Sequence, residues 1–136
     1  MQKIKEILKN AKNIAVIGAS NNPVKAAHRI PKYLQDEGYN IIPVNPNHNE
    51  ILGVKSYPKL TDIPEEIEID IVNVFRPSKE IIKILPDIIA RYDKNQDIKL
   101  LWLQEGIHSK EAAEEARKRG IEFIQGFCIY KFHAAL

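Results

Sequence analysis

Residues 13–20 read Asn-Ile-Ala-Val-Ile-Gly-Ala-Ser, and Asn21, Asn22, Pro23 and a helix-forming stretch follow them. The run of apolar residues predicts a strand that is buried on both faces, as in a parallel sheet. Gly18 allows the backbone to turn tightly, and the amides at the amino end of the next helix can face an anion. One glycine is weak evidence, so the segment alone fits a phosphate-binding turn or an ordinary strand-to-helix turn.

Length, composition and charge exclude several classes of protein. The chain has 136 residues, of which 44% are hydrophobic and 28% are charged, which predicts one globular domain over residues 1–136. A net charge of +2, with basic residues scattered among acidic ones, argues against a nucleic-acid partner. Because no apolar run reaches the length of a membrane span and no signal peptide is visible, we expect a cytoplasmic protein without a membrane partner. Abundant Ile, Lys and Glu indicate a thermophilic source.

Hydrophobic periodicity predicts strands that alternate with helices. We expect strands at residues 13–18, 40–44, 70–75, 99–103 and 121–124, and helices at residues 2–10, 23–37, 77–91 and 109–119. Pro64 limits residues 60–66 to a short helix, and Pro86 is expected to kink or divide the third helix. Ser109 is the expected amino-terminal cap of the last helix, which Gly120 closes.

This alternation predicts an α/β fold, namely a single doubly wound, Rossmann-like domain with a five-stranded parallel sheet and helices on both faces. With the strands numbered along the chain, we expect the order 3-2-1-4-5. Ligands of such sheets bind beyond the carboxyl ends of the strands where the winding reverses, which this order places between strands one and four. The residues that directly follow each strand are therefore the candidates for a binding site.

Those residues are small, polar or cationic, as a nucleotide site requires. They are Gly18-Ala19-Ser20, Asn45-Pro46-Asn47, Arg76-Pro77-Ser78, Gln104-Glu105-Gly106 and Gly126-Phe127-Cys128. The dinucleotide fingerprint is incomplete, because Ser20 replaces its second glycine and Asn45 stands where an acid would hold a ribose diol. NAD is therefore disfavoured as the ligand, without being excluded.

Further segments carry a resemblance that covers almost the whole chain in order and spacing. They are Gly18-Ala19-Ser20 with Pro23 and Lys25, Gly38-Tyr39 with Ile42-Pro43-Val44-Asn45-Pro46, Ile51-Leu52-Gly53, Val74-Phe75-Arg76-Pro77 and Trp102-Leu103-Gln104-Glu105-Gly106. Together they resemble the CoA-binding Rossmann family, which is similar to the N-terminal domain of the succinyl-CoA synthetase α subunit and of ADP-forming acyl-CoA synthetases. The resemblance implies coenzyme A, or an acyl-CoA, as the ligand.

The resemblance also implies a role for each matching position. The phosphate-facing turn would consist of Gly18, Ala19 and Ser20 with Lys25, and the nucleotide end would be lined by Val44, Asn45 and Pro46. The ligand would be flanked by Phe75 and Arg76. The passage for the pantetheine arm would be shaped by Trp102, Gln104 and Gly106. CoA carries about four negative charges and needs several cations at close range. Lys25, Arg29, Arg76 and Lys79 lie at helix starts or strand ends, where they can supply this charge.

For most of these residues the sequence also fits a position on the surface or in the core, without contact to a ligand. Lys25 and Lys79 could be solvated lysines, and Arg29 could form a surface ion pair. Trp102, inside a run of leucines, fits the core better than a ligand contact, whereas Gln104 alternates out of that strand toward the expected cleft. Phe75 fits the core and the ligand wall equally well.

No catalytic arrangement is visible in the sequence. His28, His48, His108 and His133 are dispersed, and none pairs with a nucleophile and an acid. Cys128, the only cysteine, is expected to be a small buried residue, and no zinc or other metal site is expected. The sequence predicts a stand-alone CoA-binding protein without a self-contained catalytic site. Two alternatives stay open: an NAD-binding oxidoreductase or redox sensor, and an accessory CoA-binding subunit of an acyl-CoA synthetase-like partner.

Overall fold

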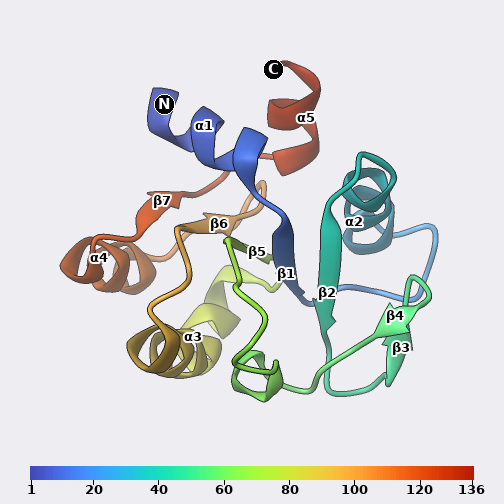
Figure 1. The fold of residues 1–136 in the computed structure, drawn as a ribbon, viewed down its shortest axis with the longest axis horizontal. Helices are drawn as coiled ribbons and strands as arrows, with labels where there is room; N and C mark the ends of the chain where they lie inside the picture. The colour runs from blue at the N-terminus through green and yellow to red at the C-terminus, as the bar shows by residue number, and fades with distance from the viewer.

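A five-stranded parallel sheet forms the centre of the computed structural model, which describes residues 1–136 (Figure 1). Its strands are β1 (Asn13–Ile17), β2 (Asn40–Val44), β5 (Ile71–Val74), β6 (Leu100–Leu103) and β7 (Glu122–Ile124), and a separate antiparallel hairpin consists of β3 (Glu50–Ile51) and β4 (Val54–Lys55). The helices are α1 (Gln2–Asn10), α2 (Ala26–Asp36), α3 (Ile81–Asn95), α4 (Lys110–Arg119) and α5 (Ile129–Ala134), with short 3-10 helices at Leu60–Asp62 and Ser78–Glu80. The predicted α/β class, the parallel sheet and all five predicted strands are confirmed.

The order of the strands differs from the expected one. β1 pairs with β2 on one side and with β5 on the other, so the order is β2-β1-β5-β6-β7, and the expectation of 3-2-1-4-5 was wrong. Pro43 gives the physical reason. Its carbonyl accepts a hydrogen bond from the Tyr57 amide at 3.0 Å on the side of β2 away from β1, so its missing N–H falls on that side too. Because β2 is unable to form a complete ladder there, it is confined to the edge of the sheet.

This order moves the point where the winding reverses. Successive strands run from β1 to β2 in one direction and from β5 to β7 in the other, so the switch point lies between β1 and β5. The expected position between the first and the fourth strand was therefore wrong by one strand. A ligand crevice is consequently expected next to Gly18 and Arg76 rather than next to β6.

Helices cover both faces of the sheet. Along β1, Ile14 and Val16 pack in a core with α1, α2 and α5, whereas Ala15 and Ile17 pack in a second core with α3 and α4. This alternation follows from the period of two along a strand. β1 is thus buried on both faces, as its apolar sequence predicts, and its end is held rigidly for the turn that follows.

Three helix boundaries show how local chemistry decides them. Ser109 caps α4, since its hydroxyl accepts the Ala112 amide at 3.0 Å, and Gly120 ends the helix at φ +73°, as predicted. α2 begins at Ala26, three residues later than expected, because Asn22 holds residues 22–25 in a turn. α3 runs through Pro86, which lies on its exposed side, where water can satisfy the carbonyl that the proline leaves unpaired.

A buried carboxylate anchors the amino-terminal edge of the sheet. Asp70 accepts hydrogen bonds from the amides of Lys12 and Asn13 at 2.9 and 3.0 Å and pairs with the ammonium of Lys99 at 3.2 Å. Burial alone would raise the pKa of Asp70, but the amides of Asn13 and Lys12 together with Lys99 outweigh it and hold the pKa below its ordinary value. Asp70 is therefore a structural residue.

None of the helices combines the length and the apolar character that crossing a membrane requires.

Candidate functional site

An open cavity of about 670 Å³ lies at the carboxyl ends of β1, β2 and β5, at the switch point of the sheet. Its lining comes from the turn after β1, the segment after β2, the end of β5 and one face of α3. The predicted site residues in this lining are Gly18, Ala19, Ser20, Lys25, Val44, Asn45, Pro46, Phe75 and Arg76. The fold thus brings residues from three separate segments together around one cavity.

The turn after β1 is held by several hydrogen bonds. Gly18 adopts φ +88°, and its amide donates to the Val44 carbonyl at 2.9 Å. The Ser20 hydroxyl accepts the Asn22 amide at 3.0 Å, which leaves its own proton free to donate to a ligand. His28, on the first turns of α2, lies 2.7 Å from the Ser20 carbonyl through Nδ1. His28 therefore fixes the turn from behind, without lining the cavity.

The amino end of α2 points at the cavity without a cap of its own. Lys25 occupies the N-cap position, no side chain caps the helix, and its first turn holds no acidic residue. The amides of Ala26 and Ala27 donate no hydrogen bond within the protein. Unpaired amides and the positive end of the helix dipole together favour an anion at this position.

Free cations line the same cavity as this helix end. Lys25, Lys59 and Arg76 line the cavity and form no ion pair, whereas Lys83 is paired with Glu80 at 3.3 Å. The aliphatic stem of Arg76 lies over Gly18, since a Cβ at Gly18 would be 3.0 Å from its Cδ. The guanidinium is therefore carried next to the turn, with all its donors available.

The acidic residues of the lining are largely occupied. Asp87 on α3 accepts the Leu60 amide at 2.7 Å and the Thr61 hydroxyl at 2.7 Å. Glu80 is taken by its ion pair with Lys83. Apart from the pair of Glu80 and Lys83, the cavity is lined by three cations, Lys25, Lys59 and Arg76, and one carboxylate, Asp87, so its net charge is positive.

Asn45 at the end of β2 is an amide, without the carboxylate that holds a ribose diol, and it forms hydrogen bonds within the protein. Its Nδ2 donates to the Ala19 carbonyl at 2.9 Å, and its Oδ1 accepts the Asn47 amide at 2.9 Å. A carboxylate at this position would accept both hydroxyls of an NAD ribose. In this chain the amide instead ties the segment after β2 to the turn after β1.

Five predicted site residues lie outside the lining, namely Arg29, Lys79, Trp102, Gln104 and Gly106. Trp102 is fully buried, which agrees with the prediction that it fits the core better than a ligand contact. Its Nε1 donates to the Phe127 carbonyl at 2.8 Å. Gln104 does not project into the cavity, which corrects its expected position. It is 4% exposed, and its Oε1 accepts the Ile129 amide at 2.9 Å and the Asn73 side chain at 3.3 Å. Because β6 is one strand removed from the switch point, its end faces another part of the sheet edge.

The surface ion pair considered for Arg29 does not form. The Nε atom of Arg29 donates to the Val24 carbonyl at 3.2 Å instead. Lys79 is exposed and unpaired in the short 3-10 helix that precedes α3. Gly106 adopts φ +82°, and nothing lies within 4 Å of the position of a Cβ.

Sequence reasoning missed several lining residues. They are Ile17, Ala27, His48, Pro58, Lys59, Glu80, Lys83, Ile84 and Asp87. His48 lies four residues after the end of β2, so its position after a strand could have indicated that it lines the cavity. Lys59 had no signal in the sequence, because it reaches the carboxyl side of the sheet through a long-range contact, the single parallel bridge between Tyr57 and Val44 at the outer edge of β2.

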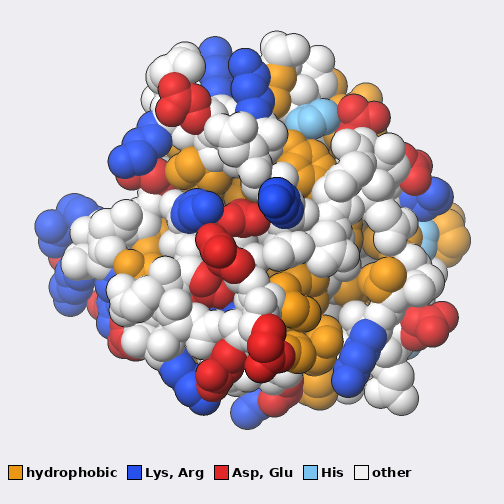
Figure 2. Space-filling model, viewed as in Figure 1, with side chains coloured by type: hydrophobic (Ala, Val, Ile, Leu, Met, Phe, Trp, Pro, Cys, Tyr) orange, Lys and Arg blue, Asp and Glu red, His pale blue; other side chains and the backbone are white.

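Charge elsewhere on the molecule is mixed. Figure 2 shows blue and red side chains interspersed over the face in view, in keeping with the net charge of +2. No group of three or more His, Cys, Asp and Glu residues is placed to hold a metal ion. Cys128 is buried, as expected.

Comparison with known proteins adds independent evidence. Residues 12–134 match the family model described as CoA binding domain. The chain is 41% identical over 131 residues to the uncharacterized protein YneT of Bacillus subtilis, a match that covers 96% of this chain and 92% of YneT. It is 33% identical over 126 residues to the alpha subunit of ADP-forming acetate–CoA ligase II of Pyrococcus furiosus, which covers 88% of this chain but only 27% of that subunit.

A solved structure agrees with these relatives. The structure of cell-free ID.343 from Thermus thermophilus superposes with a TM-score of 0.89 at 33% identity, covering 98% of this chain and 96% of that one. The similarity therefore extends over nearly the whole fold, including the elements that form the cavity.

Proposed function

We propose that this chain, which belongs to the CoA-binding domain family, binds coenzyme A in the cavity between β1 and β5. The family is related to subunits of ADP-forming acetate–CoA ligases. The observation that carries the proposal is a set of unpaired donors around one cavity, which Lys25, Ala27 and Arg76 line and whose edge at the start of α2 carries the free amides of Ala26 and Ala27. These donors match a pyrophosphate in charge and in hydrogen-bonding capacity.

The pyrophosphate of CoA would lie on the turn of Gly18, Ala19 and Ser20. The Ser20 hydroxyl has its proton available, and the stem of Arg76 covers Gly18 closely enough to bring the guanidinium to the same oxygens. Phe75 would form an apolar wall beside them. Such contacts combine orientation by the backbone with charge from two side chains.

The adenosine end would lie beyond β2. Val44 and Pro46 supply apolar surface there, and His48 and Lys59 bring polar and cationic groups to the same side of the cavity. A ribose that carries a 3′-phosphate would suit these groups, whereas a free diol would meet the Asn45 amide in place of a carboxylate acceptor. This difference favours CoA over NAD and makes an NAD-dependent oxidoreductase the poorer proposal.

We propose further that this domain, residues 1–136, acts by binding CoA or acyl-CoA and has no catalytic site of its own. Ligases that form acyl-CoA at the expense of a nucleotide need a phosphoryl acceptor and a site for the nucleotide with its magnesium. This chain corresponds to about a quarter of the Pyrococcus furiosus ligase subunit, and no Walker-type Gly-Lys-Ser/Thr sequence is present. An acyl-CoA synthetase-like partner would then supply the chemistry. The cytoplasmic location and the thermophilic source stay predictions from composition.

Calorimetric titration of one protein preparation with CoA, dephospho-CoA and NAD tests the proposal. We expect saturable binding of CoA, weaker binding of dephospho-CoA and the weakest binding of NAD. Saturable NAD binding together with no heat from CoA would overturn the proposal. Co-purification with a synthetase-like chain tests the accessory role separately.

A further inference from the structure

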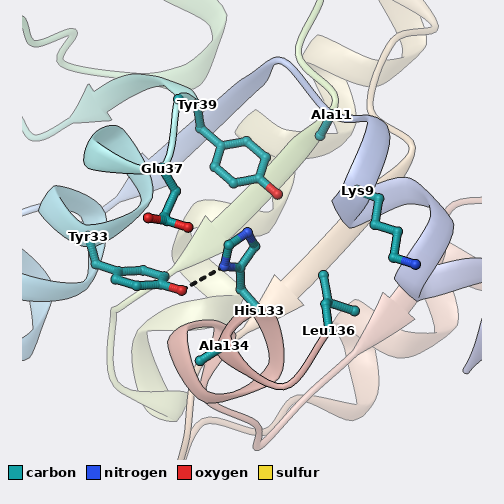
Figure 3. A pocket seen from close by; sticks show the side chains of 9 residues that line it. Lys9, Ala11, Tyr33, Glu37, Tyr39, His133, Ala134 and Leu136 are labelled. Carbon is teal, nitrogen blue, oxygen red and sulfur yellow. Dashed lines mark hydrogen bonds between the residues drawn. The ribbon is translucent and has the colours of Figure 1, made fainter.

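A second cavity, of about 490 Å³, lies where α1, α2 and α5 meet (Figure 3). Tyr39 lines it and directly precedes β2, so the cavity is at the amino-terminal edge of the sheet, opposite the proposed CoA site. Its volume falls in the range of about 300–1,000 Å³ that is usual for small-molecule sites. Nothing in the proposed function uses it.

Three rings form one wall of this cavity. Tyr33 and Tyr39 each meet His133 edge to face, with centroids 5.4 and 5.6 Å apart. The hydroxyl of Tyr33 lies 2.7 Å from Nδ1 of His133, and the hydroxyl of Tyr39 donates to the Leu8 carbonyl. The rings are thus fixed from three different elements, while Nε2 of His133 has no hydrogen-bond partner in the protein. A preformed aromatic wall of this kind suits an organic cation.

Opposite charges lie on opposite sides of these rings. Figure 3 shows Glu37 beside Tyr33 and Tyr39 at one side and Lys9 at the other, and neither forms an ion pair. Burial raises the pKa of Tyr33, and the Glu37 carboxylate raises it further. The pKa of Tyr39 is raised by burial, then by Tyr33 and then by Glu37. Both tyrosines therefore stay neutral, and Glu37 and Lys9 are the charged groups beside the rings.

We propose that this cavity binds a small linear molecule with an ammonium group at one end and a carboxylate at the other, that is, an ω-amino acid. The ammonium group lies against Glu37 and the rings of Tyr33 and Tyr39, where ion pairing and cation–π attraction act together. The carboxylate pairs with Lys9. An α-amino acid carries both charged groups on one carbon and is unable to reach both walls at once.

Titration of the chain with 5-aminovalerate and 6-aminohexanoate tests this, with pentylamine, valerate and glycine as comparison compounds. We expect saturable binding of at least one ω-amino acid and at least tenfold weaker binding of all three comparison compounds, because each lacks one charge or the span between charges. Glu37→Gln and Lys9→Met should each weaken the binding by about tenfold or more. Both positions are exposed, so circular dichroism should show native folding of both variants.

Glu66→Gln provides the matched control, since Glu66 is exposed, unpaired and outside this cavity. It should bind the ω-amino acid as the wild type does. The proposal is overturned if neither ω-amino acid binds saturably at millimolar concentration, if pentylamine binds as tightly, or if Glu66→Gln weakens binding as much as Glu37→Gln.

Discussion

Replacement of Gly18 by Ala should impair CoA binding much more than it impairs folding. Gly18 adopts φ +88°, and an added Cβ would lie 3.0 Å from Cδ and 3.4 Å from Cγ of Arg76. The positive φ costs about 1–2 kcal/mol of stability for a residue with a Cβ. The steric conflict adds little to this cost, because the stem of Arg76 is flexible and can move aside. Its movement, however, displaces the guanidinium from the turn, and a lost charge-assisted contact corresponds to about 1.5–3 kcal/mol of binding free energy.

Gly120→Ala is the matched control for the stability cost of placing a residue with a Cβ at a positive φ. Gly120 adopts φ +73° at the end of α4, and nothing lies within 4 Å of its Cβ position. Urea denaturation should therefore show similar losses of stability for both variants, about 1–2 kcal/mol. Calorimetry with CoA should show about 10- to 150-fold weaker binding for Gly18→Ala and wild-type affinity for Gly120→Ala. Wild-type CoA affinity in folded Gly18→Ala would refute the inferred contact between the Arg76 guanidinium and the ligand.

Three further predictions follow from named contacts. Lys25→Ala and Arg76→Ala should each weaken CoA binding by about 1–3 kcal/mol, and the wild-type affinity should fall with added salt because screening acts on the same attraction; calorimetry at two salt concentrations checks both, and unchanged affinity in both variants would place the phosphates elsewhere. Asp70→Ala should lower the free energy of unfolding at pH 7 by about 1.5–3 kcal/mol, whereas Asp36→Ala, which removes an exposed ion pair, should cost about 0.5 kcal/mol or less. Because the pKa of Asp70 is lowered in the folded state, its contribution is present above the pKa of an unfolded aspartate and is lost as the pH falls through the folded value, so urea titrations of wild type and variant should converge in acid. The pure chain with CoA, ATP or GTP, magnesium and short-chain acids should form no acyl-CoA by chromatography; turnover that disappears in Arg76→Ala would show that the domain is itself an enzyme.

The sequence predicted the elements of the fold better than their arrangement. Local chemistry decides features such as the Ser109 cap and the Gly120 end of α4, and these can be read from a few neighbouring residues. The strand order depends on which edge of β2 remains free, a long-range property. Pro43 held the relevant signal, since a proline inside a strand indicates an edge. α5 was missed because its six residues are too few for a clear helical period.

The candidate site divides in the same way. Gly18, Ser20 and Lys25 follow the first strand or begin the next helix, so position in the sequence was enough to place them in one cavity. Arg76 was placed there only by the family resemblance, because the assumed strand order put β5 at the edge of the sheet, away from β1. Gln104 was misplaced because the assumed strand order put β6 beside β1, whereas β5 occupies that position. The α3 face and Lys59 depend on packing between distant segments, which a single sequence does not reveal.

The location of CoA on the protein is tested most directly by backbone amide resonances recorded during a titration with CoA. The amides of Ala26 and Ala27 are free in the structure, so they should show the largest shifts on phosphate binding, together with those of Gly18 and Ser20. Arg76→Ala should require more CoA to reach the same shifts. Saturable binding that leaves the resonances of Ala26 and Ala27 unchanged would contradict a site at the amino end of α2.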